Sequence, residues 1–203
     1  MMIALLLGTT AVVVGLARGG SLESLATTPL RWLGLLFGGL GLQVAAALWS
    51  PPWLTPQWAL LVVVLSNLAI VLFIAANRRL PGMLIADLGV ALNLLVIVVN
   101  GAMPVSAVAA RQAGIETVPS PVALKHERMT DATALPWLGD IVPLPVVGEV
   151  LSIGDVLLAA GIARLVYART TGADDGKAPT PSRASGLRPA AGPAPPPSRR
   201  RPR

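Results

Sequence analysis

The chain has no cysteine, little charge and a single histidine. Without Cys among its 203 residues it can form neither disulfide bonds nor thiolate metal sites. Charged residues make up 13% of the chain, whereas a typical soluble domain carries about 25%. One histidine leaves no second imidazole for a zinc-hydrolase pattern. These absences argue against a soluble globular domain and against the common zinc hydrolases.

What the chain has instead is long apolar stretches. A helix needs about 20 mostly apolar residues to cross a bilayer. Four stretches come near this length with Asp87 as their only charged residue, and a fifth is apolar apart from Asp155 and Arg164. The stretches are 2–17, 32–49, 58–76, 82–99 and 150–168. We therefore predict an all-α fold, a membrane bundle of about five transmembrane helices within a domain that covers 1–168.

The charges of the connections predict the orientation of this bundle. Connections 18–31 and 77–81 are net positive, whereas 50–56 is uncharged and 100–149 is net negative. Lys and Arg concentrate on the cytoplasmic side of membrane proteins. We therefore expect the N-terminus and 100–149 outside the cytoplasmic membrane, and the C-terminus in the cytoplasm. The first stretch has no basic residue before it, which favours an uncleaved span over a signal peptide.

The outer connection 100–149 is expected to be structured. Residues 106–114 are typical of a short helix with Ser106 as N-cap and Gly114 as its stop. Residues 132–148 are apolar but contain three prolines, which exclude a regular helix. Because bare backbone is not stable against lipid, we predict a lid or a shallow re-entrant segment that packs on the outer ends of the helices.

The tail 169–203 is rich in Pro and Arg and carries most of the net positive charge. It has too little apolar surface to offset the entropy of ordering, so we predict a disordered cytoplasmic tail. Its basic end either contacts anionic lipids of the inner leaflet or stays solvated. Since the remainder of the chain is close to neutral, nucleic acid is not an expected partner.

Ionisable and amide side chains in the apolar stretches are candidates for function, because they are costly inside a membrane. The candidates are Asp87, Asn93, Asn100 and Asp155. Asp87 either pairs with Arg31 or Arg79 at the inner rim or belongs to a substrate or proton site. Asp155 either caps its helix, pairs with His126 or a neighbouring basic residue, or belongs to such a site.

Small residues form a further pattern. Gly34 and Gly38, with Gly41 beyond them, lie on one face of the second stretch. Such a face lets another helix approach closely. It indicates either helix packing within the chain or an interface in a homo-oligomer.

Common catalytic patterns are incomplete. His126-Glu127 begins the H-E-x-x-H pattern, but position 130 is Thr. Asp87 and Asp155 fall near opposite ends of neighbouring spans, which disfavours an aspartyl dyad. No nucleophile elbow, phosphate loop or dinucleotide fingerprint is present. We therefore predict neither a cofactor nor a metal, and name His126, with Asp140 or Asp155, as weak catalytic candidates. A Ser–Lys dyad of Ser106 or Ser152 with Lys125 stays open as an alternative.

An ordered run of motifs over residues 3–168 resembles a bacterial multi-pass membrane family, the domain of unknown function DUF5317. The motifs are Arg79-Leu-Pro-Gly82, Leu92-Asn93, Asn100-Gly-x-Met-Pro-Val-Ser106, Lys125-His126, Leu138-Gly-Asp-Ile and Ser152-Ile-Gly-Asp155. The resemblance implies a bacterial membrane protein with no assigned activity. It directs attention to Asn93, Asn100, Met103, Pro104, His126, Asp140 and Asp155, most of which fall on the outer side in the predicted topology.

Three functions remain open at the level of the sequence. The first is a non-enzymatic membrane component that binds a protein partner or a lipid through its outer connection. The second is a small transporter or channel subunit that uses Asp87, Asn93 and Asp155, which would require oligomerisation. The third is a membrane-embedded enzyme that acts on a lipid-linked substrate at the outer face.

Overall fold

Helices make up most of the chain in the computed structural model, which describes residues 2–48, 55–115 and 126–172. The helices are α1 (Met2–Ala17), α2 (Leu22–Ala26), α3 (Leu33–Leu48), α4 (Pro56–Ala76), α5 (Met83–Asn100), α6 (Ala107–Gln112) and α7 (Ile153–Thr171). Each of the five predicted apolar stretches corresponds to one long helix, with ends within a few residues of the prediction. The predicted disordered tail falls, from residue 173 on, outside the described residues.

Two helical segments are long and apolar enough to cross a membrane by length and composition, Gln57–Ala76 and Met83–Asn100. Two further segments are apolar but shorter, Leu6–Ala17 and Leu33–Ala45. These helices suggest a membrane protein, although a buried core helix of a soluble protein can pass the same test.

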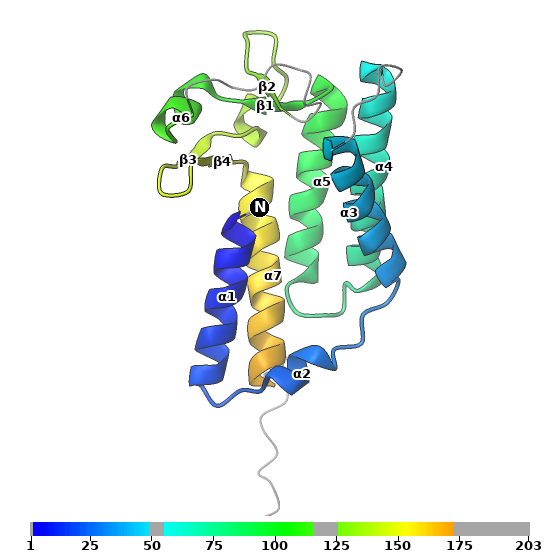
Figure 1. Cartoon of the computed structure of the whole chain (residues 1–203), viewed down its shortest axis with the longest axis vertical. Coiled ribbons are helices and arrows are strands. Elements are labelled where there is room, and N and C mark those ends of the chain that lie inside the picture. The colour runs from blue at the N-terminus through cyan, green and yellow to red at the C-terminus, as the bar shows by residue number, and fades with distance from the viewer. Residues whose placement is uncertain (1, 49–54, 116–125, 173–203) are drawn as a thin grey trace, which may run out of the picture.

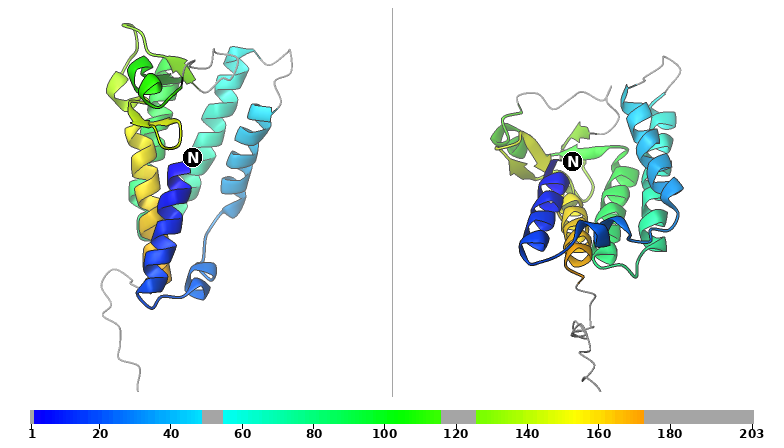
Figure 2. Two further views of the ribbon diagram at one scale, coloured as in Figure 1. Left: turned by 60° about the vertical axis from the view of Figure 1, so that its left-hand side comes forward. Right: turned by 60° about the horizontal axis from the view of Figure 1, so that its bottom comes forward.

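The five long helices stand side by side in a row, in the order α1, α7, α5, α4 and α3 (Figures 1 and 2). The last helix of the chain therefore lies between the first helix and α5. Glycines bring α5 and α7 close together. A Cβ atom at Gly89 would collide with the backbone oxygen of Gly154, and one at Gly154 would collide with Asn93. This close crossing places the N-terminus of α7 directly beside the outer half of α5.

Backbone groups tie the inner ends of the row together. The side chain of Asn77, which follows α4, accepts a hydrogen bond from the backbone N–H of Arg31 and donates one to its carbonyl, both at 2.9 Å. The backbone N–H of Ser21, just before α2, donates to the carbonyl of Thr170 at 2.7 Å. The connections on this side are thus anchored to α4 and α7.

The outer connection contains strands that the all-α prediction missed. Strand β1 (Met103–Val105) pairs in parallel with β2 (His126–Arg128), and β3 (Val142–Leu144) pairs with β4 (Glu149–Leu151) in antiparallel fashion. Each strand has only three residues, too short for an alternating apolar pattern to show in the sequence.

Two predictions for the outer connection are confirmed. Helix α6 begins after Ser106, whose hydroxyl accepts a hydrogen bond from the N–H of Ala109, and Gly114 adopts a positive φ of 80° behind it. The proline-rich segment forms the 3₁₀ turn η2 (Pro136–Leu138) and strand β3 rather than a regular helix. Leu138 packs with Val96 of α5 and Met103, which joins the lid to the helix row.

The glycine face of α3 does not pack against the described part of the chain. A Cβ atom at Gly34, Gly38 or Gly41 would meet no described atom within 4 Å, whereas Gly39 lies against the backbone of Ser66 in α4. Within residues 2–48, 55–115 and 126–172, the packing expected for the Gly34–Gly38 face is therefore not found. The oligomer interface stays a prediction.

Candidate functional site

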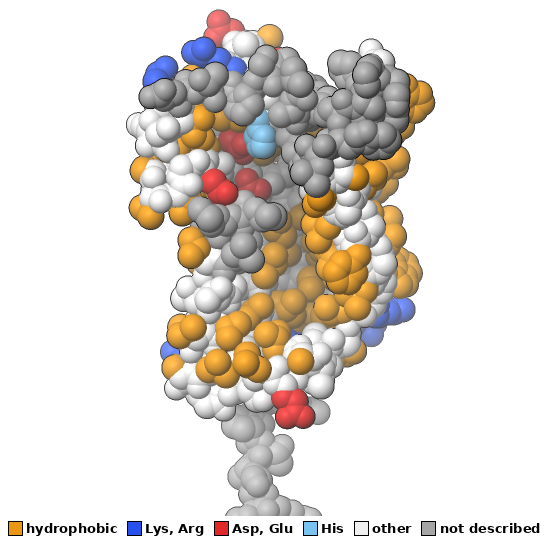
Figure 3. Space-filling view, viewed as in Figure 1, with side chains coloured by type: hydrophobic (Ala, Val, Ile, Leu, Met, Phe, Trp, Pro, Cys, Tyr) orange, Lys and Arg blue, Asp and Glu red, His pale blue; other side chains and the backbone are white. Residues whose placement is uncertain are grey.

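A cleft of about 540 Å³ lies beneath the outer connection. Its walls come from α3, α4, α5, the start of α7 and the strands. The lining residues are Gln43, Val63, Asn67, Asn93, Ile97, Met103, Val105, Ala110, Ile115, His126, Asp140, Gly148, Glu149, Val150, Leu151 and Asp155. Figure 3 shows the same face, with the histidine and several acidic side chains at the top of a hollow and hydrophobic side chains below them. The cleft thus has an imidazole and carboxyls in its roof, whereas its helix walls mix the amides of Gln43, Asn67 and Asn93 with apolar side chains.

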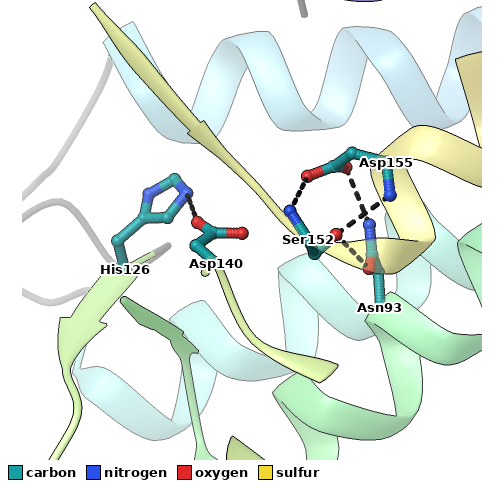
Figure 4. A network of polar contacts seen from close by, with 5 residues as sticks. All are labelled: Asn93, His126, Asp140, Ser152 and Asp155. Carbon is teal, nitrogen blue, oxygen red and sulfur yellow. Dashed lines mark hydrogen bonds and ion pairs between the residues drawn. The ribbon is translucent and has the colours of Figure 1, made fainter. Parts of the chain in front are cut away.

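The roof of the cleft holds a contact between His126 and Asp140. The β1–β2 pairing places His126 opposite Met103, and a bridge between Val105 and Asp140 brings the aspartate to the same strand. Nε2 of His126 lies 3.4 Å from Oδ2 of Asp140 (Figure 4). The histidine side chain is 46% exposed, whereas that of Asp140 is 5% exposed. A buried carboxyl thus contacts an imidazole that solvent can reach.

Burial changes the acidity of Asp140. Removal of the carboxyl from water raises its pKa from the ordinary 3.8 to about 8, and the negative charge of Asp155 adds to this effect. Near neutral pH the carboxyl of Asp140 therefore carries a proton. The second carboxyl oxygen, Oδ1, is buried and has no hydrogen-bond partner among the described residues.

A second polar network fixes the start of α7 against α5 (Figure 4). Asn93 donates from Nδ2 to Oδ1 of Asp155 at 2.9 Å, and its Oδ1 accepts a hydrogen bond from the Ser152 hydroxyl at 2.9 Å. Ser152 and Asp155 also form a capping box, in which each side chain accepts a backbone N–H of the other residue. Of the alternatives open for Asp155, the structure shows helix capping.

The other candidate residues have different surroundings. Asn100 bonds both backbone groups of Ala134 and so holds the lid on α5. Met103 is buried and lines the cleft, while the carbonyl of Pro104 accepts the backbone N–H of Asp140 at 2.8 Å.

Asp87 does not line the cleft. Its Oδ1 is buried without a hydrogen-bond partner, and it forms no ion pair with Arg31 or Arg79 in the described part of the chain. The pairing expected at the inner rim is therefore not found.

Ser152 and Glu149 belong to the site but were not among the main candidate residues identified from the sequence. The pattern Ser152-x-x-Asp155 is a capping-box signature and indicated the role of the serine. Glu149 lines the cleft from β4, a strand too short to recognise. Asn67 also lines the cleft, and its Nδ2 donates to the carbonyl of Val63 in its own helix at 2.8 Å.

Two observations concern the hydroxyl of Ser152 and the possible metal ligands. The Ser152 hydroxyl donates its proton to Asn93, so His126 does not activate it. Within residues 2–48, 55–115 and 126–172, no group of three or more His, Asp or Glu side chains could hold a metal ion.

The sequence model of one family matches residues 27–167, and its description is "Family of unknown function (DUF5317)". No curated protein and no solved structure matches the chain.

Proposed function

Since the chain belongs to DUF5317, a family of unknown function, we propose a function from its geometry. The protein is a five-span component of a bacterial cytoplasmic membrane that binds a lipid or another amphipathic molecule in the cleft beneath its outer connection. The observation that carries this proposal is the cleft itself, which combines ionisable groups in its roof with amide and apolar side chains on its walls.

The surface of the helix row supports the membrane setting. Every long helix exposes large apolar side chains. Examples are Val13, Phe37, Leu65, Leu84 and Val156, from α1, α3, α4, α5 and α7 in turn. Soluble proteins rarely expose apolar patches of this extent, whereas lipid covers them at no cost.

The composition of the cleft walls supports an amphipathic ligand. Val63, Ile97 and Leu151 offer apolar contacts, and His126 and Asp140 offer hydrogen-bonding groups at one end. Sites for small molecules are typically apolar with a few polar groups that orient the ligand. An entirely polar solute would leave the apolar walls in contact with water.

One alternative function, acid–base catalysis, is supported by a specific observation. The His126–Asp140 contact brings together two of the weak catalytic candidates, and such a pair could act as an acid–base catalyst on a lipid-linked substrate. We rank this below binding because Ser152 is held by Asn93 and Asp155 and offers no nucleophile.

Filling the cleft tests the proposal. Gln43 lines the cleft from α3, while its neighbour Val44 is 56% exposed. The full chain in maltoside micelles is titrated with three dodecyl probes: dodecyltrimethylammonium, dodecyl phosphate and monolauroylglycerol. We expect at least one probe to bind saturably, Gln43→Trp to weaken it by about tenfold or more, and Val44→Trp to leave it unchanged. Absence of saturable binding by every probe, or an equal effect of both variants, would refute the proposal.

A further inference from the structure

We propose that the ligand of the cleft is a cationic amphiphile whose ammonium group binds beside Asp140 and Asp155. This inference rests on the proposed binding function and names the chemical class of the ligand. The apolar chain of the amphiphile lies in the lower part of the cleft.

The charge of the lining selects a cation. Three carboxyl groups face the cleft, from Asp140, Glu149 on β4 and Asp155 on α7. Among the described lining residues there is no Lys and no Arg, and His126 is the only basic side chain. A phosphate or sulfate head group would lie beside the carboxyls of Asp140 and Asp155, with no guanidinium or ammonium among the described lining residues to bind it. An ammonium head group is complementary to the same surface.

An orphaned oxygen indicates where the head group binds. Oδ1 of Asp140 is buried and has no hydrogen-bond partner in the described part of the chain. Figure 4 shows that the Asp140 carboxyl lies between His126 and the network of Ser152 and Asp155. A buried acceptor without a donor is costly. An alkylammonium group supplies the missing donor, or a positive charge if its nitrogen is fully methylated.

The geometry favours an organic cation over a metal ion. The carboxyls and the imidazole around the cleft do not form a group of three that could hold a metal. The cleft is also much larger than an ion, and Val63, Ile97 and Met103 contribute apolar surface. An ammonium group with an attached alkyl chain can contact both the carboxyls and the apolar surface of the cleft.

Proton release follows from the acidity of the site. Among the described lining residues, the titratable groups near Asp140 are His126 from β2, Glu149 from β4 and Asp155 from α7. The positive charge of the N-terminal amino group also acts on Asp140 and partly lowers its pKa. With a pKa of about 8, Asp140 holds its proton at neutral pH. A cation at short distance lowers this pKa and drives the proton off. As the pH rises toward 8, the affinity for the cation therefore increases by up to about tenfold per pH unit. Above pH 8 the affinity becomes constant.

Calorimetry of the full chain in maltoside micelles tests this inference. Dodecyltrimethylammonium is titrated at about pH 6.5 in two buffers with different ionisation enthalpies, which yields the number of protons released. We expect about one proton per ligand and an affinity at least about tenfold above that for dodecyl phosphate or monolauroylglycerol. Asp140→Asn should weaken binding by about tenfold or more and abolish proton release. Glu127→Gln removes a carboxyl from the same connection outside the cleft lining and should change neither.

The outcomes separate this inference from the function on which it rests. Equal binding of all three probes, or preference for dodecyl phosphate, with sensitivity to Gln43→Trp would overturn the cation inference and leave the amphiphile site intact. Cation binding without proton release, or unaffected by Asp140→Asn, would likewise overturn the inference. Binding of tetramethylammonium as tight as that of its dodecyl analogue would exclude a role for the apolar chain.

Discussion

At the scale of single residues, Asp140 shows how position changes the chemistry of a common side chain. Its backbone bonds to Pro104 and Ser106 place the carboxyl under the lid, where it loses water and faces Asp155. The imidazole of His126 offsets part of the cost. The residue is therefore a proton donor at a pH where aspartate is ordinarily charged.

The stability of the protein should depend on this proton. The folded state binds it more tightly than the unfolded state, so the Asp140 contribution is most favourable below about pH 4 and is lost as the pH rises to about 8. The loss is at most about 6 kcal/mol, since about 1.4 kcal/mol corresponds to one pH unit. Asp140→Asn should abolish this dependence and raise the unfolding temperature above pH 8.

Thermal unfolding in maltoside micelles at several pH values measures this effect. Glu127→Gln, which replaces an exposed carboxyl nearby, serves as the control. A wild-type protein and an Asp140→Asn variant with identical pH profiles would show that the buried carboxyl does not control stability.

At the scale of elements, the crossing of α5 and α7 positions the site. Gly89 and Gly154 let the two backbones approach, and Asn93 then reaches both Ser152 and Asp155. The N-terminus of α7 is thereby held under the lid, which keeps Asp155 near Asp140.

A methyl group at this crossing should destabilise the protein. The Cβ atom of Gly89→Ala would collide with the backbone of α7, and such overpacking costs about 1–3 kcal/mol. Gly38→Ala is the matched control, because open space surrounds that position and Ala favours a helix by about 0.5–1 kcal/mol. Unfolding temperatures in micelles should therefore fall for Gly89→Ala and stay or rise for Gly38→Ala. The reverse order would contradict the close crossing.

At the scale of the whole molecule, the row of five helices leaves one face hollow beneath the outer connection (Figures 1 and 3). The row order differs from the chain order because α7 returns between α1 and α5. The lid, the start of α7 and the outer half of α5 thus meet at one end, while the inner connections lie at the other.

The proposed orientation can be measured directly, because the chain has no cysteine of its own. Val146 is 98% exposed in the turn between β3 and β4, and Ser24 is exposed in α2 at the opposite end. We expect a membrane-impermeant maleimide to label Val146→Cys in spheroplasts, and Ser24→Cys only after lysis. The opposite pattern would mean an inverted bundle, and labelling of both would contradict a membrane-spanning row.

Much of the fold could be predicted from the sequence, whereas the site could be predicted only in part. The helix-forming stretches, the cap at Ser106 and the non-helical lid were all visible as local patterns. The His126–Asp140 contact was not, because it depends on a parallel strand pair formed across more than twenty residues. No local pattern records such a pairing.

The sequence by itself determined the five apolar helices, the absence of thiol chemistry and the family, since these follow from composition, local periodicity and motif order. Only the tertiary structure decided that α7 lies beside α5, that Asn93 of α5 donates a hydrogen bond to Asp155, and that Asp140 is buried beside an imidazole. Those features come from contacts between residues distant in the chain. The energies of these contacts depend on burial and on how closely two backbones approach. Both are set by the packing of the folded chain.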